Sequence, residues 1–537
     1  MLLSLRTITP LSLAALLACD GGINSDETYE PAFTLSLTPV VPANQSPFES
    51  VDELLLVVES TDGAPMEYPL SRTSGSPTLD GVEPFEEATL AIEGYAGGEL
   101  VAFGRTGTLS MTEGELSAQV LVGEVDAFAW TEGLDKGLHD ASLVAAGDGT
   151  FLAFGGTTQS PNLGSGGAED TIQRLRIADP GEDLEFLPAG TMPEYTTLGE
   201  TYTGRSGATA ILLEGSGAGE GTILVAGGAN GSLQVDSVTG HAFLYDPATE
   251  SIVYELEMKV PRWGQSVATV DGDVYFFGGV QENESAGQLS RVMQVELFDR
   301  ETGTFEYLNQ NLGGSSSYIP LFGAAASMQE DGALFCGGLD LVDADGDSDA
   351  DWKAVPDCYA VSVSGVLSEV DAMPMEVINH QLTSLDDGRV LLTGGVLADD
   401  WLDQNESAPP AARIYVYDPG SGSWADTQQD LFVPRHHHAA ALLPDGRVLI
   451  AGGTADNGDL AGQDSGDGLA CAEIYDPSNN TLELLDDCSA DDEVSSLPVR
   501  MVDPSVAVDP EYGVVLFGGL DDGGAVDAAA LWMGRPR

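Results

Sequence analysis

A short hairpin pattern that returns seven times along the chain limits the folds this sequence can adopt. Its clearest copy is residues 435–453, RHHHAAALLPDGRVLIAGG, in which two runs of small and apolar residues flank Asp445-Gly446 and the second run ends in paired glycines. An Asp-Gly pair between two short strands predicts a tight hairpin whose turn needs positive φ. The other paired glycines are Gly155-Gly156, Gly227-Gly228, Gly278-Gly279, Gly337-Gly338, Gly394-Gly395 and Gly518-Gly519.

The spacing of this pattern predicts stacked blades. Successive paired glycines lie 51 to 72 residues apart, and most are followed by a third strand that ends in a turn, as in IYVYDPGSG at 414–422. Repeats of this length cannot bury their own apolar faces, so they stack on one another. Hairpin, double glycine, Tyr-Asp-Pro turn and Trp-bearing strand together resemble the kelch repeat, and this resemblance implies a seven-bladed β-propeller.

The predicted ring needs a strand from the N-terminal side. The seventh repeat stops after its third strand at 528–534, whereas residues 125–133 form an unassigned strand that carries Trp130 where the fifth repeat has Trp424. We therefore expect an all-β protein in which residues 124–537 form a seven-bladed kelch-like propeller and residues 124–133 complete the last blade. Closure leaves only short, protected edges.

The first 30 residues read as a targeting segment. Residues 1–18 contain Arg6 and a short apolar run, and Cys19 follows Leu16-Leu17-Ala18. The run is too short to span a membrane and is typical of a processing signal. It resembles a bacterial lipoprotein signal, which implies that Cys19 carries lipid and anchors the protein in the cell envelope, at the outer membrane and periplasm or at the cell surface. An ordinary cleaved signal with an incidental Cys19 is the alternative. Residues 19–30 have the composition of a flexible tether.

Residues 31–122 predict a small, separate β-sandwich. They lack double glycines and contain alternating apolar and polar runs punctuated by Pro and Gly. This pattern is typical of an immunoglobulin-like or transthyretin-like sandwich. Such a domain acts more often as a spacer than as a binding site. The expected strands are 33–40, 52–60, 88–97, 99–107 and 116–124.

The charge of the chain excludes one class of partner. Its formal net charge is −68, with 87 acidic and 19 basic residues. Phosphate backbones and anionic lipid head groups would repel such a surface, so nucleic acid is excluded as a partner. The same charge favours solubility and attracts cations.

Four cysteines besides Cys19 predict two disulfides. In antiparallel strands the residue numbers of paired positions add up to a constant, so half of this sum marks the middle of the connecting segment. For two of the possible cysteine pairings this midpoint falls in a predicted turn or loop. Export would place the thiols in an oxidising compartment, where disulfides within a blade stabilise its hairpins. We expect the bonds Cys336–Cys358 and Cys471–Cys488, which leave no catalytic thiol.

An acidic loop between the first cysteine pair predicts a calcium site. The segment DADGDSDAD alternates carboxylates around Gly346. Hard cations that take six to eight oxygen ligands suit such a segment, although the spacing departs from that of an EF-hand. A solvated acidic loop without calcium is the alternative. The candidate ligands are Asp343, Asp345, Asp347, Asp349 and Asp351.

Basic residues gather where the innermost strands would begin. Long loops and these strand starts share one face of a propeller, where binding residues usually lie. The basic residues could hold a carboxylate by charge-assisted hydrogen bonds, or could instead bond backbone carbonyls of a neighbouring blade. His436 and His438, at i and i+2, could ligate zinc or copper together with His380, or could pack within the hairpins. The candidate residues are Arg205, Arg262, His380, Arg435, His436, His438 and Arg500.

These features favour a binding or scaffold protein over an enzyme. The expected ligand is a protein or a glycan at the loop-rich face, and calcium is the expected cofactor. The alternative is a metal-dependent propeller enzyme, because a seven-bladed kelch ring is also similar to the catalytic domain of galactose oxidase. That site needs two tyrosines, two histidines and a cysteine that is joined to one of the tyrosines. This chain lacks a recognisable Tyr-His pair, and its cysteines are expected to pair with one another. No catalytic residue is assigned.

Overall fold

The computed structural model contains β-strands as its regular elements. It describes residues 34–60, 64–70, 78–80, 82–112, 115–131, 133–158, 168–178, 184–197, 199–231, 237–283, 288–308, 323–328, 332–342, 351–397, 409–455, 468–485, 496–521 and 524–535. Within these ranges no helix is long and apolar enough to cross a membrane. The chain divides into two compact units, one ending at Ala129 and including Arg176–Leu184, and one comprising Trp130–Leu175 and Glu185–Arg537.

The first unit contains eight paired strands. Their order is β3-β2-β5-β6-β8-β1-β4, and β7 pairs with β5. All five strands expected from the sequence are present. The bounds are β1 Thr34–Val40, β2 Glu53–Ser60, β3 Met66–Pro69, β4 Thr78–Asp80, β5 Phe85–Ala96, β6 Glu99–Arg105, β7 Leu109–Met111 and β8 Glu115–Glu124.

Strand β8 joins two groups of strands in this unit. From Glu115 to Leu121 it pairs in parallel with β1, and from Val122 to Glu124 it pairs antiparallel with β6. Apolar side chains from both groups, among them Leu35, Leu56 and Ile92, form one buried cluster. Along the first half of β1, buried Leu35 and Leu37 alternate with the more exposed Thr34 and Ser36, as expected where one face of a strand covers a core.

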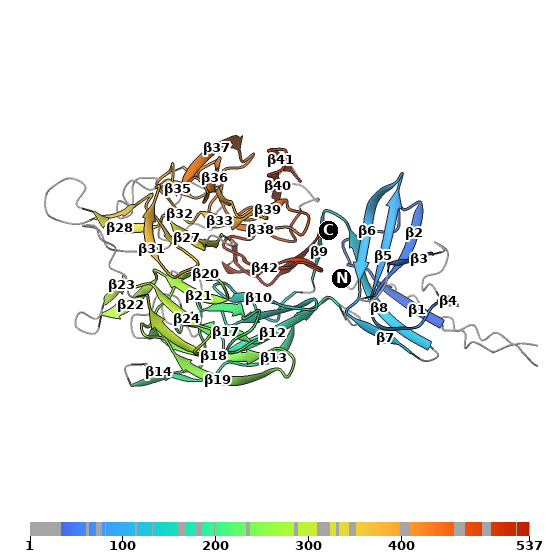
Figure 1. The fold of residues 1–537 in the computed structure, drawn as a ribbon, viewed down its shortest axis with the longest axis horizontal. Coiled ribbons are helices and arrows are strands. Elements are labelled where there is room, and N and C mark those ends of the chain that lie inside the picture. The colour runs from blue at the N-terminus through green and yellow to red at the C-terminus, as the bar shows by residue number, and fades with distance from the viewer. Residues whose placement is uncertain are drawn as a thin grey trace, which may run out of the picture. The chain divides into compact units, whose positions relative to one another are not determined.

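The described residues from Ala127 onward form seven four-stranded sheets, which confirm the predicted all-β fold and seven-bladed propeller (Figure 1). The strands of blades 1 to 4 are β10 Ser142–Gly147, β11 Thr150–Phe154, β12 Thr171–Arg176 and β13 Leu187–Thr191; β16 Thr209–Leu212, β17 Ile223–Ala226, β18 His241–Asp246 and β19 Ser251–Glu257; β20 Ser266–Val270, β21 Asp273–Phe277, β24 Glu296–Asp299 and β25 Thr304–Tyr307; β26 Ala324–Ser327, β27 Ala333–Cys336, β30 Cys358–Val361 and β31 Leu367–Val370.

The last blade takes its fourth strand from before the first. Its sheet order is β42-β43-β46-β9, and the Thr131 amide donates to the carbonyl of Ala529 at 3.2 Å. The strands of blades 5 to 7 are β33 Gln381–Ser384, β34 Val390–Thr393, β36 Arg413–Asp418 and β37 Ser423–Asp430; β38 Ala439–Leu442, β39 Val448–Ala451, β40 Ala472–Asp476 and β41 Thr481–Leu484; β42 Ser505–Asp509, β43 Gly513–Phe517, β46 Ala529–Met533 and β9 Ala127–Trp130.

Short two-stranded sheets are added to several blades. Most are hairpins, whereas β32 and β35 flank the β33–β34 hairpin. They comprise β14 Tyr195–Thr197 with β15 Glu200–Tyr202, β22 Val280–Asn283 with β23 Gln288–Arg291, β28 Leu339–Val342 with β29 Asp351–Ala354, β32 Val377–Ile378 with β35 Val396–Leu397, and β44 Leu520–Asp521 with β45 Gly524–Ala525.

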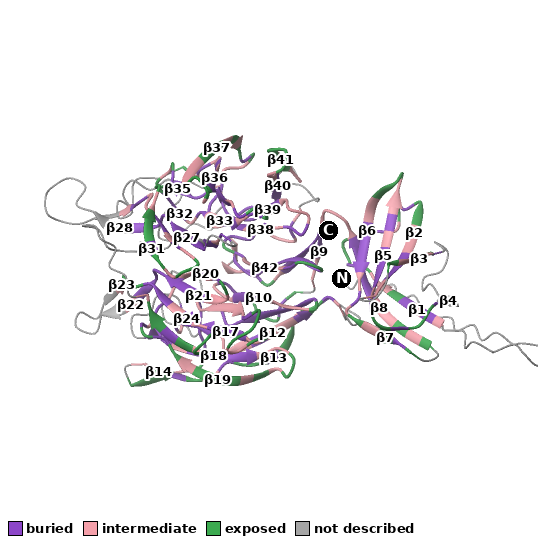
Figure 2. Ribbon diagram, viewed as in Figure 1, coloured by how far each residue is buried: buried purple, intermediate pink, exposed green. Residues whose placement is uncertain are grey.

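The core of the propeller lies between neighbouring blades. Along β17, Ile223 and Val225 pack with blade 1, while Leu224 and Ala226 pack with blade 3. Every residue of β17 is buried, whereas the outer strand β19 carries mostly exposed residues (Figure 2). A strand covered on both faces reads as a continuous apolar run, which explains the ILVA, VLLT and VLIA segments before the double glycines.

The Asp-Gly hairpins adopt two geometries. At Asp148-Gly149 and Asp271-Gly272 both residues have positive φ, between 49° and 87°, as predicted from the sequence. At Gly388 and Gly446 only the glycine does, because the turn is wider and the glycine amide donates to the carbonyl of the residue three positions earlier. Asp and Gly tolerate this left-handed region better than other residues.

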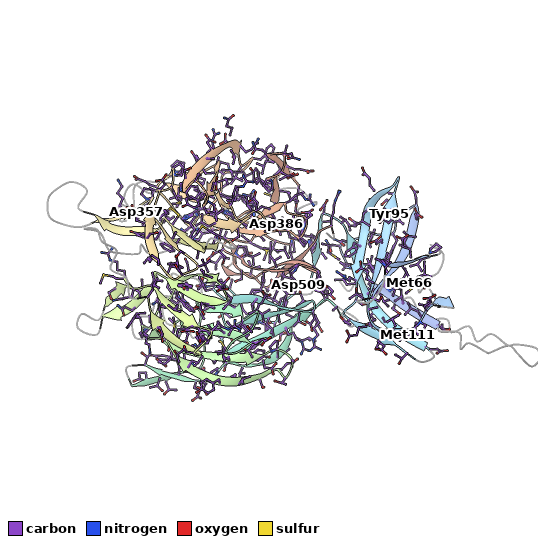
Figure 3. All side chains as sticks on the ribbon, in the orientation of Figure 1. Met66, Tyr95, Met111, Asp357, Asp386 and Asp509 are labelled. Atoms are coloured by element: carbon purple, nitrogen blue, oxygen red, sulfur yellow. A yellow bond between two sulfur atoms is a disulfide. The ribbon has the colours of Figure 1, made fainter. Side chains whose placement is uncertain are left out.

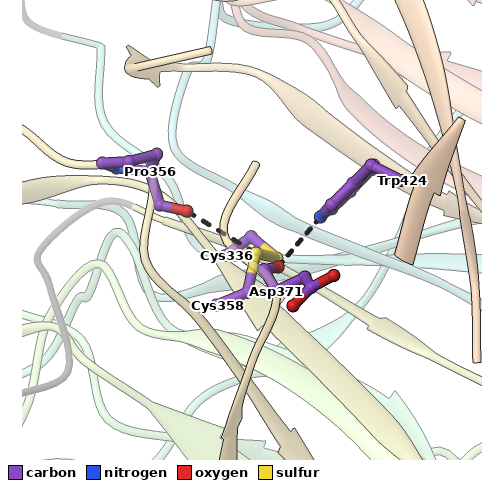
Figure 4. Close-up of a disulfide and its surroundings, with 5 residues drawn as sticks. All are labelled: Cys336, Pro356, Cys358, Asp371 and Trp424. Carbon is purple, nitrogen blue, oxygen red and sulfur yellow. Dashed lines mark hydrogen bonds between the residues drawn. A yellow bond between two sulfur atoms is a disulfide. The ribbon is translucent and has the colours of Figure 1, made fainter. Parts of the chain in front are cut away.

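One predicted disulfide is formed within blade 4 (Figure 4). Cys336 on β27 and Cys358 on β30 are directly paired in the sheet, with Cα atoms 4.2 Å apart. The sulfur of Cys471 is also engaged in a disulfide, and Cys488 lies outside the described residues.

Candidate functional site

The candidate site is built on the mouth segments, which we define as the five-residue stretches that lead into the inner strands. In each stretch, the first residue accepts a backbone hydrogen bond from the second glycine of the preceding blade. The carbonyl of Arg205 accepts from Gly156 at 3.0 Å, and that of Arg435 accepts from Gly395 at 2.9 Å. The described mouth segments are 138–142, 205–209, 262–266, 377–381, 435–439 and 501–505.

The first glycine of each pair leaves room for this contact. A Cβ added to Gly394 would lie 2.3 Å from the carbonyl oxygen of Arg435, and one added to Gly155 would lie 2.2 Å from that of Arg205. No side chain fits at that separation, and both glycines also have positive φ. The double glycine therefore joins one blade to the next, which is why it recurs in every repeat.

Three arginines predicted at the mouth are buried inside their own blades. Arg205, Arg262 and Arg435 are each 0% exposed. The Arg435 guanidinium donates to the carbonyls of Gly452 and Cys471 at 2.9 and 3.3 Å. The accepting carbonyls belong to the arginine's own blade, so the predicted contact with a neighbouring blade is wrong. A neighbouring blade instead donates to the arginine's own carbonyl.

Two buried acids that sequence reasoning missed complete these contacts. Glu473 accepts from Arg435 at 2.7 Å, and Glu296 accepts from Arg262 at 2.9 Å; all four side chains are fully buried. Burial lowers the pKa of both arginines, and the neighbouring carboxylate opposes this shift. A detectable signal existed, because each glutamate stands alone in an apolar third strand, three residues before the turn aspartate.

In blade 2 the buried arginine has a different set of partners. Arg205 donates to the carbonyls of Gly227 and His241 at 3.3 and 3.0 Å, and its guanidinium lies over the Tyr195 ring, 4.9 Å from the centroid. Burial lowers the pKa of Arg205 to about 10, so the group stays protonated at neutral pH. Phe243 occupies the place that glutamate holds in blades 3 and 6.

The predicted histidine cluster is divided among separate contacts. His436 Nδ1 lies 2.7 Å from His437 Nδ1, whereas His438 Nε2 lies 2.9 Å from the Thr393 hydroxyl. His380 packs on Gly337 of the preceding blade, and burial lowers its pKa to about 4. Among the described residues, no group of three or more His, Cys, Asp or Glu side chains is arranged to hold a metal ion.

Arg500, the calcium loop and Cys19 are the other positions predicted to have a function. Arg500 is half-buried beside Gly468. Of the proposed calcium ligands, Asp343, Asp345, Asp347 and Asp349 lie outside the described residues, as does Cys19, and Asp351 begins β29.

A second ring of residues lies within the mouth segments. Their third residues have positive φ and are linked by backbone hydrogen bonds, such as Gly207 to Asp140 at 2.9 Å and Asp503 to His437 at 2.7 Å. The Asp503 side chain is accessible to water, but surrounding protein atoms raise the pKa of its carboxyl to about 7, and repulsion from Asp140 adds to the shift. Burial lowers the pKa of His437 to about 4, and Asp140 opposes this shift.

The described residues form a cavity near the C-terminal ends of the inner strands, on the side of the hairpin turns. It has a volume of about 700 Å³ and is lined by residues of β10, β16, β20 and β42 and of the turns that follow β16 and β20. The sequence had placed function on the loop-rich face, whereas this cavity lies on the hairpin side. The lining comes from blades 7, 1, 2 and 3, and no single repeat reveals it.

Comparison with known proteins gives a partial structural similarity. No protein-family model matches the chain, and no curated protein matches its sequence. The solved structure of YjhT matches 66% of this chain and 99% of its own length, at 14% sequence identity and with a TM-score of 0.44. The chain is an all-β protein with a seven-bladed propeller. The seven four-stranded sheets by themselves establish this fold.

Proposed function

We propose that the chain is an exported, lipid-anchored binding or scaffold protein that recognises a protein or a glycan at the loop-rich face of its kelch-like propeller. One observation carries the proposal. In blades 1, 2, 3, 5, 6 and 7 the residue after the double glycine pairs with a mouth segment, as in the bridges Thr157 to His139 and Thr454 to His436. The bases of the long loops are therefore held on a rigid ring, which is the arrangement that binding loops require.

Loop replacement tests the binding role. Residues 159–167, 398–408 and 456–467 would each be replaced by Gly-Ser segments of equal length in the mature protein. Binding to an array of envelope glycans and envelope proteins should fall at least tenfold for one replacement, while the melting temperature stays near that of the wild type. Unchanged binding by all three variants would refute recognition at this face.

The anchor requires a separate test. Cys19→Ala should move the protein from the detergent phase to the aqueous phase and abolish incorporation of labelled fatty acid. An unlabelled wild-type protein would contradict lipidation and support an ordinary cleaved signal.

The role of residues 343–351 is tested by counting calcium per chain, because stoichiometric calcium should disappear from the Asp345→Asn/Asp347→Asn variant.

The alternative is a metal-dependent propeller enzyme. Stoichiometric copper or zinc, lost on replacing His436 and His438, would favour it over a binding protein. The contacts of His438 with Thr393 and of His436 with His437 favour packing roles for these side chains.

A further inference from the structure

The cavity on the hairpin side has the form of a ligand site. Its volume of about 700 Å³ lies within the usual range for small-molecule sites, and its walls include backbone and apolar side chains of four inner strands. The apolar lining residues are Leu143, Val144, Ala145, Ile211, Leu212, Val506, Ala507 and Val508.

One wall is an insertion that the fold holds in place. In blade 2, residues 213–222 replace the short hairpin turn of the other blades, and Arg300 of blade 3 braces them. The Arg300 guanidinium donates to the carbonyls of Glu214, Gly215 and Ala218 at 3.0, 3.2 and 2.9 Å, and Arg300 is 4% exposed. A Gly-rich segment would otherwise sample many conformations, so this brace fixes where Glu214 enters the lining.

Two carboxylates of the lining are exposed and have no partner within the described part of the chain. They are Glu214 of the insertion and Asp271 of the β20–β21 turn. The equivalent turns of blades 5 and 6 neutralise their own charge, because Arg389 donates to Asp387 and Arg447 donates to Asp445, both at 2.7 Å. In blade 3 the residue at the place of these arginines is Asp273.

We infer that this cavity binds an aliphatic amine, with its ammonium group at Glu214 and Asp271 and its hydrocarbon chain along the aliphatic side chains of the inner strands. Ammonium groups donate short, charge-assisted hydrogen bonds to carboxylates, and methylene groups gain free energy when they leave water. A long-chain diamine or the side chain of a lysine has both parts. This site is independent of the loop-rich face and of the function proposed above.

Calorimetric titration of the mature protein with 1,5-diaminopentane tests the inference. We expect one bound diamine per chain, and we expect binding of monoamines to tighten about three- to fourfold for each added methylene. The variant Glu214→Gln/Asp271→Asn should weaken binding at least tenfold. Glu306→Gln, an exposed acid on the outer strand β25, is the matched control and should bind like the wild type.

Several results would overturn the inference. Equal weakening by Glu306→Gln, or many weak sites that vanish in high salt, would mean general attraction to an acidic surface. Equal binding of pentanol would mean that the carboxylates take no part. An absence of binding by the folded wild type would mean that the cavity holds only water. Replacement of the long loops should leave diamine binding unchanged, so failure of one proposal is distinguishable from failure of the other.

Discussion

At the scale of single residues, buried ion pairs connect the strands of a blade. Arg435 connects the carbonyls that follow β39 and precede β40, and Glu473 accepts from its guanidinium and from the amides of Phe432 and Val433. Such a pair contributes little when intact, because desolvation offsets attraction, but removal of one partner leaves an uncompensated buried charge.

Arg435→Met should therefore destabilise the propeller by about 3–5 kcal/mol. Arg413→Met is the control, because Arg413 forms half-exposed ion pairs with Asp426 and Asp430, and its loss should cost less than about 1 kcal/mol. Urea unfolding monitored by tryptophan fluorescence measures both. Adding Glu473→Leu to Arg435→Met should recover part of the loss, and equal losses for the two single variants would contradict this role.

Asp503 should make stability depend on pH. Its pKa is raised from 3.8 in the unfolded chain to about 7 in the folded one, so its contribution is fully present below the unfolded pKa and is lost as pH rises through the folded value. Asp503→Asn, which also tolerates the φ of 55°, should melt higher than the wild type at about pH 8, and this advantage should shrink toward about pH 5.

Comparing the wild type with Asp503→Asn separates the contribution of Asp503 to the pH dependence of stability from the contributions of the other titratable groups. His437 has a lowered pKa, so its contribution is present above the unfolded pKa of 6.5 and is lost as pH falls toward about 4. This trend opposes that of Asp503, but it is common to the wild type and the variant. Asp371→Asn, at an exposed position, is the control. A constant difference in melting temperature across this range would refute the assignment to Asp503.

At the scale of elements, turn chemistry fixes the hairpins and the third strands. The Asp246 carboxylate accepts from the amide of Ala248 at 2.8 Å, and the Asp476 carboxylate accepts from that of Ser478 at 2.8 Å. These contacts mimic a backbone turn and explain the recurring Tyr-Asp-Pro sequence. The double glycine does more than turn the chain, because it brings two blades into contact.

Alanine substitutions at two glycines allow the cost of backbone strain to be measured separately from the cost of a steric clash. Gly422 has a φ of 68° and open space around it, whereas Gly394 has a φ of 59° and faces the Arg435 carbonyl. Gly422→Ala should cost about 1–2 kcal/mol through its backbone conformation alone. Gly394→Ala should cost a further ~1–3 kcal/mol because the neighbouring blade must move. Similar losses in thermal unfolding would contradict the proposed junction between blades.

The disulfide of blade 4 should add measurable stability. It closes a loop with a sequence separation of 22 residues, and loop-closure entropy predicts about 3 kcal/mol. Cys336→Ala/Cys358→Ala should lower the urea midpoint accordingly. Mild reduction of the variant should then have a smaller effect than mild reduction of the wild type. No change in the midpoint would show that pairing of β27 with β30 suffices.

At the scale of the whole molecule, closure of the ring distributes stability around it. Asp509, which is labelled in Figure 3, is the last residue of β42 in blade 7. Its carboxylate accepts from the Gly149 amide of blade 1 at 3.1 Å, and the Ser505 hydroxyl donates to the Ala141 carbonyl at 2.6 Å. Inner strand β10 contacts both β16 and β42, so the first and last blades meet directly. Removal of one blade edge should therefore weaken the entire ring.

Truncation tests this dependence. A chain that starts at residue 124 retains β9, whereas one that starts at residue 134 leaves β46 with an unpaired edge. We expect the first to unfold in one cooperative transition and the second to melt lower and to aggregate through the exposed edge. Size-exclusion chromatography and calorimetry measure both properties. Equal stability would mean that β9 is dispensable.

The sequence by itself determined the repeat, the hairpins, the double glycines and the Cys336–Cys358 pair, because each depends on neighbouring residues or on register within one blade. Tertiary structure alone decided which carbonyls Arg262 and Arg435 donate to. It also revealed that Glu296 and Glu473 accept hydrogen bonds from these arginines, because the two glutamates lie more than 30 residues away along the chain. It also decided where the cavity lies. Four blades contribute its walls, and the brace of Arg300 on the insertion of blade 2 follows from the stacking of blades, which a linear pattern does not encode.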